Sequence, residues 1–379
     1  MRYVGCKRRL LPFIHNMIIQ NNIEANTFCD LFAGTATVGH YFKQQGFKII
    51  SSDLLYTAYV LQQVKIRINQ MPSFKQVAKH LSLKSVNQGG YAQAVIDYLN
   101  QLNGIKGFIY RHYTVGGTQK QSVTRCYYTD SNAKKIDVIR ETIEVWQQLK
   151  LINDDEFYIL LYALLNEASR CANTTATMSS FLKHYSRKAL QQIQLKVPEI
   201  TASAYEHEVY CENSINLLDK LDVVDILYLD PPYTTTQYAA SYHLLETIAR
   251  WDFPALSGIS GKRETKSLHS SLSSKREAFN ALERIVASGR YRHLLMSYSS
   301  DSIIPHDTLM PLFQEYGEVS VSTQALRRYN SMSRDDPRMN PGTHVEERLY
   351  YLKPNATPKV SNLVAANNKP MLSAFQVLN

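Results

Sequence analysis

The chain has 379 residues, of which 44% are hydrophobic and 20% charged, so its composition excludes a disordered or low-complexity protein and predicts a folded one. At roughly 100 to 200 residues per domain, this length predicts two domains or one domain with a large insertion. Lys and Arg number 42 against 33 Asp and Glu, a formal net charge of +9. This excess favours a polyanionic partner, with nucleic acid as the first candidate, although many soluble proteins are mildly basic.

Residues 27–53 show the opening pattern of a nucleotide-binding α/β sheet. TFCDLFAG predicts a buried strand running into a glycine loop, TATVGHYFKQQG a helix ending near Gly46, and FKIISSD a second strand ending at Asp53. An ionised carboxylate offers only acceptors and can accept two hydrogen bonds from the hydroxyls of a ribose. Asp53 is therefore a candidate for nucleotide binding, and its alternative role is to cap the helix predicted after it.

Residues 54–205 interrupt this alternation and are predicted to be mainly helical, with the clearest helices at 133–149 and 154–168. Basic and aromatic side chains interleave within residues 107–130, and this mixture suits contacts with phosphates and stacking on bases. An ordinary solvated hairpin would have a similar composition. The candidates for DNA contact in this segment are Arg111, Tyr113, Lys120 and Arg125.

The sheet pattern returns at residues 206–218, and the apolar run 223–229 predicts a central parallel strand. Later elements are predicted as a helix at 275–288 and strands within 293–300, 317–326 and 346–354. Two polar loops, 257–274 and 327–342, are predicted to be mobile and to face DNA. Their basic candidates are Lys262, Arg263, Arg327 and Arg334. The polar tail, 354–379, is predicted to be a strap over the domain or partly disordered.

No segment predicts a membrane span, because the longest uncharged apolar run, 157–165, is far shorter than the roughly 20 residues that cross a bilayer. Residues 1–15 lack the apolar stretch and cleavage site of a signal peptide, so we expect a cytoplasmic protein. The five cysteines are scattered and never lie at zinc-site spacing, and we expect no metal site.

Asp230-Pro231-Pro232-Tyr233 follows the apolar run directly, which places it at the carboxyl edge of the sheet, where ligands of open α/β folds bind. Two successive prolines remove two backbone donors and keep the chain extended, so nearby carbonyls are left to accept hydrogen bonds. Asp230 and such a carbonyl would form an acceptor pair for an exocyclic amino group, and the Tyr233 ring could stack on the same heterocycle. The alternative is a proline-rich turn that merely ends a strand.

With these motifs, the chain resembles the alpha group of adenine-N6 DNA methyltransferases, the Dam-like family of bacterial restriction-modification systems and phages. The matching segments occur in the family's order: RYVGCKRRLLPFI, DLFAGTATVGHYF, SSD, GFIYRHYT, YYTDSNAKKID, DPPY, SYHLLETIARWD and SYSSDSIIP. The resemblance implies a class I S-adenosylmethionine-dependent methyltransferase sheet, Rossmann-like, formed by residues 1–53 and 206–353. It also implies that residues 54–205 are an inserted, mainly helical target-recognition region.

The resemblance also assigns roles to individual residues. Those implied to surround the cofactor S-adenosylmethionine are Tyr3, Lys7, Asp30, Phe32, Ala33, Gly34, Thr35, Asp53, Asn213 and Asp230. Asn213 stands where the family usually has an acidic residue beside the cofactor adenine. Those implied to bind the target adenine are Asp230, Pro231, Pro232 and Tyr233. Double-stranded DNA is the implied partner, a cognate restriction endonuclease is a further candidate, and a monomer in the bacterial cytoplasm is expected.

Other functions compete with this interpretation. Cytosine-N4 and RNA methyltransferases also present an exocyclic amino group to such a tetrapeptide, but Asp at position 230 and the overall match favour adenine in DNA. A carbon-5 cytosine methyltransferase would need a Pro-Cys pair, which the chain lacks. A dinucleotide dehydrogenase would suit Gly34, Gly39 and Asp53 but has no use for DPPY. A non-catalytic DNA-binding subunit of the same fold is disfavoured by the intact Asp230 and Tyr233.

Overall fold

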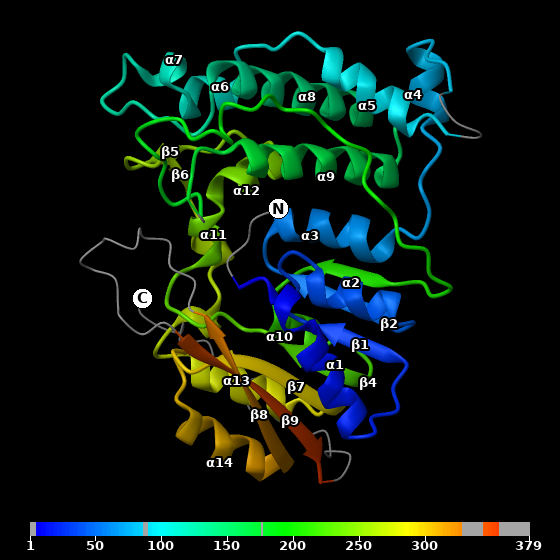
Figure 1. Cartoon of the computed structure of the whole chain (residues 1–379), viewed down its shortest axis with the longest axis vertical. Helices are drawn as coiled ribbons and strands as arrows, with labels where there is room; N and C mark the ends of the chain where they lie inside the picture. The colour runs from blue at the N-terminus through cyan, green and yellow to red at the C-terminus, as the bar shows by residue number, and fades with distance from the viewer. Residues whose placement is uncertain (1–4, 86–89, 176, 328–343, 356–379) are drawn as a thin grey trace, which may run out of the picture.

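The central feature of the fold is a mixed, mostly parallel β-sheet (Figure 1). The computed structural model describes residues 5–85, 90–175, 177–327 and 344–355. Within them the sheet has seven strands in the order β3-β2-β1-β4-β7-β9-β8. The strand bounds are β1 Thr27–Asp30, β2 Lys48–Asp53, β3 Glu208–Cys211, β4 Val224–Leu229, β7 Tyr291–Ser299, β8 Gly317–Arg327 and β9 His344–Pro354. β3, β2, β1, β4 and β7 run parallel, whereas β9 is antiparallel to β7 and to β8.

Helices cover both faces of this sheet. In β4, Ile226 and Tyr228 belong to a buried core shared with α1 and α2, whereas Leu227 and Leu229 belong to a second core shared with α10, α13 and α14. These helices are α1 Leu11–Gln20, α2 Thr37–Gln44, α10 Ser214–Leu218, α13 Ala278–Ala287 and α14 His306–Tyr316. Because both faces are buried, β4 is apolar along most of its length. The predicted α/β class and the predicted central parallel strand are confirmed.

Gly39 lets α2 pack closely against the sheet. A Cβ atom at this position would lie 2.8 Å from Ile66 Cδ1 and 3.3 Å from Ile49 Cγ2. A larger residue would therefore push α2 away from β2. Since α2 begins directly after the loop that joins it to β1, this close packing helps to fix the position of that loop.

A second layer, built of helices, lies above the sheet in Figure 1 and has its own apolar core. Its helices are α4 Lys75–His80, α5 Ala92–Gln101, α6 Phe108–Tyr113, α7 Val115–Thr118, α8 Asp130–Gln148, α9 Asp154–Cys171 and α12 His243–Arg250. α8 and α9 confirm the two predicted long helices. α9 begins with a capping box, in which the Asn153 side chain accepts from the Glu156 amide and the Glu156 side chain accepts from the Asn153 amide. This reciprocal pair fixes where α9 starts.

Residues 107–130, for which a solvated hairpin was the alternative, contain the two short helices α6 and α7. The Thr114 side chain accepts from the Gly117 amide and so caps α7. Gly117 is needed there, because a Cβ would lie 2.0 Å from the carbonyl oxygen of Tyr110. Tyr127 and Tyr128 are fully buried in the helical core. The aromatic residues of this segment therefore serve mainly to pack the helices.

The helical layer also contains a segment from outside the predicted recognition region. α3 (Tyr56–Gln62) and the π-helix Gln63–Arg67 enter it from the sheet, and residues 242–251 return to it after DPPY. Glu246 of α12 is fully buried and accepts hydrogen bonds from the amides of Tyr56 at 3.0 Å and Thr57 at 2.9 Å. Glu246 therefore caps α3. The division at residues 54–205 stays a prediction, and α12 belongs to the same apolar core.

Short elements complete the described chain. They are α11 Tyr238–Ser241, the paired strands β5 Leu256–Ser257 and β6 Lys262–Arg263, and the 3-10 helices Lys7–Arg9, Lys266–Leu268 and Ser271–Ser273. Most of the loop 327–342 and of the tail 354–379 lies outside the described residues. Among the helices that the structure describes, none is long and apolar enough to span a membrane.

Candidate active site

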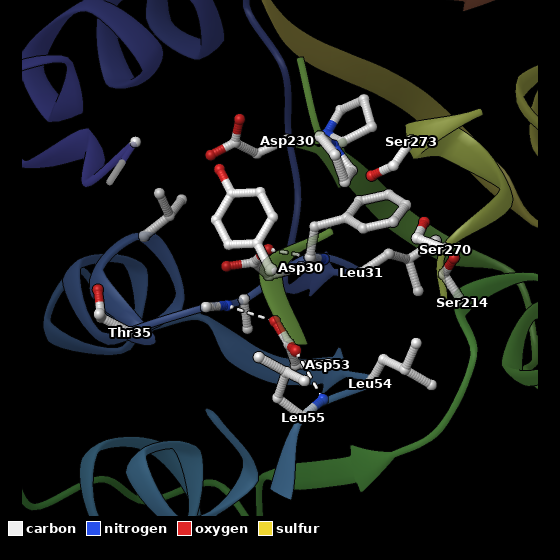
Figure 2. Close-up of a pocket in the computed structure, with 18 of the residues that line it drawn as sticks. Asp30, Leu31, Thr35, Asp53, Leu54, Leu55, Ser214, Asp230, Ser270 and Ser273 are labelled. Atoms are coloured by element: carbon white, nitrogen blue, oxygen red, sulfur yellow. Dashed lines mark hydrogen bonds between the residues drawn. The ribbon is translucent and has the colours of Figure 1, made fainter. Parts of the chain in front are cut away.

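Three neighbouring parallel strands each lead to an aspartate at the same edge of the sheet. Asp30 ends β1, Asp53 ends β2, and Asp230 directly follows β4. All three line one pocket, and Figure 2 shows their carboxyl groups around it. The strands after β1 are added on one side of it (β2, β3) and later strands on the other side (β4, β7), so the strand order reverses between β1 and β4, which is where open α/β sheets bind ligands. The aspartates predicted at the ends of these strands therefore line one pocket.

The loop between β1 and α2 forms one wall of the pocket through its backbone. The Gly34 amide donates to Asp53 Oδ2 at 2.9 Å, and the Ala33 amide donates to the carbonyl oxygen of Ser52 at 3.0 Å. Gly34 has a φ of 50°, a left-handed conformation that glycine adopts at little cost. Ala36 also has a positive φ, 56°, just before α2 begins. This tight turn brings the loop backbone against the end of β2.

Asp53 is tied to the backbone on both sides. Its Oδ2 accepts from Gly34, and its Oδ1 accepts from the Leu55 amide at 2.9 Å. Glu246 accepts from the first two amides of α3, whereas Asp53 accepts from the Leu55 amide that directly precedes them. Partial burial raises the pKa of Asp53 to about 6, although these backbone donors oppose the shift. The carboxylate is thus held in place at the pocket wall, with each oxygen retaining a further lone pair.

Asp230 and Tyr233, which are half-buried, form a polar cluster with the buried Lys7 and Glu347. The Lys7 ammonium lies 3.0 Å from Asp230 Oδ1 and 2.8 Å from Glu347 Oε1, and it also donates to the Tyr233 hydroxyl. The Tyr233 hydroxyl in turn donates to Glu347 Oε1 at 2.5 Å. Lys7 Nζ lies 4.4 Å from the centre of the Tyr233 ring. The tetrapeptide is therefore fixed by residues from both ends of the described chain.

The carboxyl groups of the pocket have raised pKa values. Burial raises the pKa of Asp30 to about 8, and the charges of Asp230 and Asp53 add to this effect. Burial also raises the pKa of Asp230 to about 6, with Lys7 opposing the shift and Glu347 adding to it. Acidic groups that share a poorly solvated site resist ionisation together. A pocket of this kind favours a positively charged or hydrogen-donating ligand.

Most of the predicted site residues meet in this pocket. Those that line it are Lys7, Asp30, Phe32, Ala33, Gly34, Thr35, Asp53, Asn213, Asp230, Pro231, Pro232 and Tyr233. Asn213 also caps α10, because its side chain accepts from the Ile215 amide at 3.0 Å. Tyr3 lies outside the described residues. Among the described residues, no group of three or more His, Cys, Asp or Glu side chains is placed to hold a metal ion.

Sequence reasoning missed several contributors to the pocket. Ser270 and Ser273, from a loop that we predicted to face DNA, line the pocket instead. Gln237 fixes this loop, accepting from the Ser270 amide at 3.0 Å and donating to its carbonyl oxygen at 3.3 Å. Glu347 was also missed. The sequence does hold one sign of it: Glu347 lies two and four residues before Leu349 and Tyr351, so in a strand it shares their buried face.

Two of the residues predicted to contact DNA are structural. Tyr113 is fully buried, and its hydroxyl donates to the carbonyl oxygen of Gly261 at 2.8 Å. Arg125 is 8% exposed and donates to the carbonyl oxygens of Ile259, Gly258 and His112 at 3.0, 3.1 and 3.3 Å. These bonds anchor the β5–β6 hairpin to the helical layer. The polar groups of both residues bind protein backbone in the described structure, and their contact with DNA stays a prediction.

The other basic candidates differ in how accessible they are. Arg111 and Lys120 are exposed, and Lys262 is half-buried in β6. Arg263 forms a two-pronged ion pair with Asp252, with distances of 2.9 and 2.6 Å. Arg327 ends β8, and Arg334 lies outside the described residues. Arg111 and Lys120 are therefore the best placed of the described candidates to reach a phosphate.

The chain is similar in sequence to several proteins that are named as methylases or methyltransferases. The chain is 33% identical to modification methylase LlaI of Lactococcus lactis subsp. lactis, over 97% of this chain and 57% of that protein. It is 31% identical to type II methyltransferase M.FokI of Planomicrobium okeanokoites, over 97% of this chain and 55% of that protein. It is also 31% identical to type II methyltransferase M.NlaIII of Neisseria lactamica, over 87% of this chain and 93% of that protein.

The chain thus spans little more than half the length of the first two relatives. The sequence pattern of the D12 class N6 adenine-specific DNA methyltransferases matches residues 3–309. This match includes the loop after β1, the helical layer and the tetrapeptide after β4. The mostly parallel sheet is consistent with the class I S-adenosylmethionine-dependent methyltransferase fold expected from the sequence. The chain belongs to the D12 class N6 adenine-specific DNA methyltransferase family.

Proposed function

We propose that the protein is a site-specific methyltransferase of the alpha group, which transfers a methyl group from S-adenosylmethionine to the N6 amino group of adenine in double-stranded DNA. The observation that carries this proposal is that Asp230 and Tyr233 of DPPY line the same pocket as Asp30 and Asp53. Family membership supports the same chemistry. We further propose that it acts as a monomer in the cytoplasm, as the modification half of a restriction-modification system.

The pocket fits S-adenosylmethionine in charge and in hydrogen-bonding capacity. Asp53 offers acceptors for the ribose hydroxyls, and the loop around Gly34 offers a close backbone wall for the methionine part. Asn213 can accept and donate near the cofactor adenine. Asp30 and Asp230 are acidic groups that suit the positive charges of an ammonium and a sulfonium. When bound, S-adenosylmethionine supplies an electrophilic methyl group.

Asp230 is proposed to activate the adenine by accepting a hydrogen bond from its amino group. The lone pair of this nitrogen is delocalised into the ring, and hydrogen bonds that the amino group donates to Asp230 and to the Pro231 carbonyl oxygen would favour a pyramidal, more nucleophilic nitrogen. When the nitrogen takes the methyl group, the carbon–sulfur bond breaks and positive charge develops on the nitrogen, which the ionised Asp230 stabilises. The excess proton of the amino group then leaves to Asp230 or to water. The protein needs no nucleophile of its own, because alignment supplies most of the acceleration.

Tyr233 is proposed to stack on the adenine after this base has been flipped out of the duplex. Burial and the charges of Asp230 and Glu347 hold the pKa of Tyr233 well above its ordinary value, so its hydroxyl stays protonated and does not act as a base. Flipping costs a few kcal/mol, which stacking and phosphate contacts must offset. Arg111 and Lys120 are proposed to supply such phosphate contacts.

A transfer assay tests the proposed function. The protein is incubated with tritium-labelled S-adenosylmethionine and either duplex DNA of mixed sequence or duplex RNA, and the products are digested to nucleosides. We expect the label in N6-methyldeoxyadenosine and in no RNA nucleoside. Label in N4-methyldeoxycytidine or in RNA would assign a different acceptor, and no transfer with bound cofactor would indicate a non-catalytic subunit.

Asp53→Ala is expected to weaken S-adenosylmethionine binding by about 1 to 2 kcal/mol, because a charged acceptor for the ribose hydroxyls is lost. Isothermal titration calorimetry measures this change, with the exposed Asp222→Ala as the control. An analogue that lacks both ribose hydroxyls should bind the parent and the Asp53 variant with similar affinity. An equal loss for that analogue would show that Asp53 acts only by holding the Gly34 loop. NAD is expected not to bind.

Arg125→Ala is expected to lower the free energy of unfolding by about 2 to 4 kcal/mol, because it leaves buried carbonyl oxygens without their donors. Lys120→Ala, on an exposed side chain of the same segment, should change it by less than about 0.5 kcal/mol. Urea denaturation measures both. If Lys120 contacts a phosphate, Lys120→Ala should also reduce the slope of log binding constant against log salt concentration by about one. Equal stability of the two variants would contradict the structural role of Arg125.

A further inference from the structure

Glu347 is a buried carboxylate that the proposed mechanism does not use. It lies on β9, 114 residues after Tyr233 in the chain, and is 4% exposed. Its Oε1 accepts from the Lys7 ammonium at 2.8 Å and from the Tyr233 hydroxyl at 2.5 Å. A charge is rarely buried without a partner, and here both partners belong to the pocket.

Lys7 bridges Glu347 and Asp230. Its ammonium is 2.8 Å from Glu347 and 3.0 Å from Asp230 Oδ1. Although burial opposes it, the charges of Asp230 and Glu347 raise the pKa of Lys7 above its ordinary value, so Lys7 stays protonated. If only Lys7 and Asp230 were present, the positive charge of Lys7 would cancel the negative charge of Asp230. No net negative charge would then face the adenine amino group, which becomes positive during the transfer. Glu347 brings a second carboxyl group to the same ammonium, so the cluster holds two acidic groups against one basic group.

We propose that Glu347 is a positioning residue for methyl transfer, which balances the Lys7 ammonium and holds the Tyr233 hydroxyl so that the Asp230 carboxylate keeps its full negative charge for the adenine. This inference rests on the proposed function. Preorganised negative charge stabilises a transition state only where another group does not already neutralise it. Glu347 thus acts on the reaction through Lys7 and Tyr233, without touching the adenine.

The positioning role of Glu347 can be measured through the pH dependence of methyl transfer, because charged groups around Asp230 shift its pKa. Among the described residues, the titratable groups that interact with Asp230 include Lys7, Asp30, Tyr228, Tyr233, Tyr238 and Glu347. Lys7 and Glu347 act on Asp230 in opposite directions, since Lys7 lowers its pKa and Glu347 raises it. Burial raises the pKa values of Tyr228, Tyr233 and Tyr238 and keeps these hydroxyls protonated at neutral pH, and it raises the pKa of Asp30 to about 8.

The test compares Glu347→Gln with the matched control Glu346→Gln. Glu346 is the preceding residue of β9, and its side chain is 56% exposed and pairs with Arg348. At pH 8, Glu347→Gln should lower kcat by about tenfold, the effect of losing one charged hydrogen-bond partner, whereas Glu346→Gln should match the parent. The acid limb of the pH profile should move to lower pH in Glu347→Gln and to higher pH in Lys7→Met. The double variant should return toward the parent profile, because it loses one acidic and one basic group together.

A purely structural role for Glu347 would lower stability without shifting the two profiles in opposite directions. Unchanged kcat and pH profile in a folded Glu347→Gln, or shifts of both variants in the same direction, would overturn the proposal. If Glu347→Gln does not fold, Lys7→Met and the double variant decide. An upward shift in Lys7→Met that is reversed in the double variant supports the proposal, and its absence overturns it.

The proposed function fails separately, if the parent and Glu346→Gln transfer no methyl group. The effect of Glu347 and Lys7 on Asp230 is then measured without an activity assay. NMR of protein with labelled carboxyl groups follows the titration of Asp230, and the Asp230→Asn variant assigns its signal. Opposite shifts of the Asp230 titration in Glu347→Gln and Lys7→Met support this effect, and unshifted titrations overturn it.

Discussion

Asp230→Asn is expected to reduce methyl transfer by on the order of a thousandfold or more, because the uncharged amide cannot stabilise the positive charge that develops on the adenine nitrogen. Single-turnover transfer from labelled S-adenosylmethionine measures this loss. Asp222→Asn, on an exposed side chain just before β4, is the matched control and should match the parent. Circular dichroism and cofactor binding should be largely unchanged in both variants. Near-normal turnover by Asp230→Asn would contradict the mechanism.

The same residue predicts the pH dependence of the parent. Because burial raises the pKa of Asp230 to about 6, this carboxyl is ionised above that pH and protonated below it. Only the ionised form is a full acceptor, so kcat/KM should be constant at higher pH and should fall as the pH drops through about 6. An acid limb near pH 4, the ordinary range for a carboxyl, would show that Asp230 is better solvated than its burial indicates.

Tyr233→Ala is expected to lower the transfer rate by on the order of a hundredfold, because a base stacked on an aromatic ring gains about 1 to 3 kcal/mol and this variant also loses the bond to Glu347. Tyr233→Phe keeps the ring and should stay within about tenfold of the parent, the effect of one hydrogen bond to a charged group. Rapid-quench measurement of a single turnover compares the two. Tyr205→Ala, on a partly exposed tyrosine outside the pocket, is the control.

The comparison of the two Tyr233 variants separates stacking from the hydroxyl contact. If Phe and Ala reduce the rate equally, the hydroxyl carries the effect and the ring does not. In that case Lys7 and Glu347, which both contact the hydroxyl, would explain why Tyr233 is needed. If neither variant slows transfer, Tyr233 has no part in the reaction.

The catalytic core of the fold was predictable because its signals are local. β4 is apolar from Ile226 to Leu229, since helices cover both of its faces, and the tetrapeptide follows it without a gap. Likewise, the ends of β1 and β2 could be located from the glycine loop and from Asp53. Parallel strands carry their carboxyl ends to the same edge of a sheet, so the position of these residues at strand ends was enough to predict that they lie close together.

The parts that could not be predicted depend on contacts between distant segments. Arg125 and Lys120 look alike in the sequence, but a hairpin more than 130 residues later supplies carbonyl oxygens that bury Arg125 and leave Lys120 exposed. Glu347 looks like any acidic residue of a strand until β9 pairs with β7 and brings it to Lys7. The placement of α12 in the helical layer has the same origin. The sequence shows which charged side chains a segment contains, but it does not show which of them are exposed in the folded protein.

The capping of α3 by Glu246 restricts how the molecule can open. Glu246 holds the first amides of α3, and Arg140 of α8 donates to the carbonyl oxygens of Ile248 and Ala249 at 3.0 and 3.3 Å, so α12 is fastened to α3 and α8 at once. A hinge between α12 and α3 would uncap α3 directly after Asp53. We therefore expect α3, α8 and α12 to move as one body, so that the start of the helix behind Asp53 stays fixed.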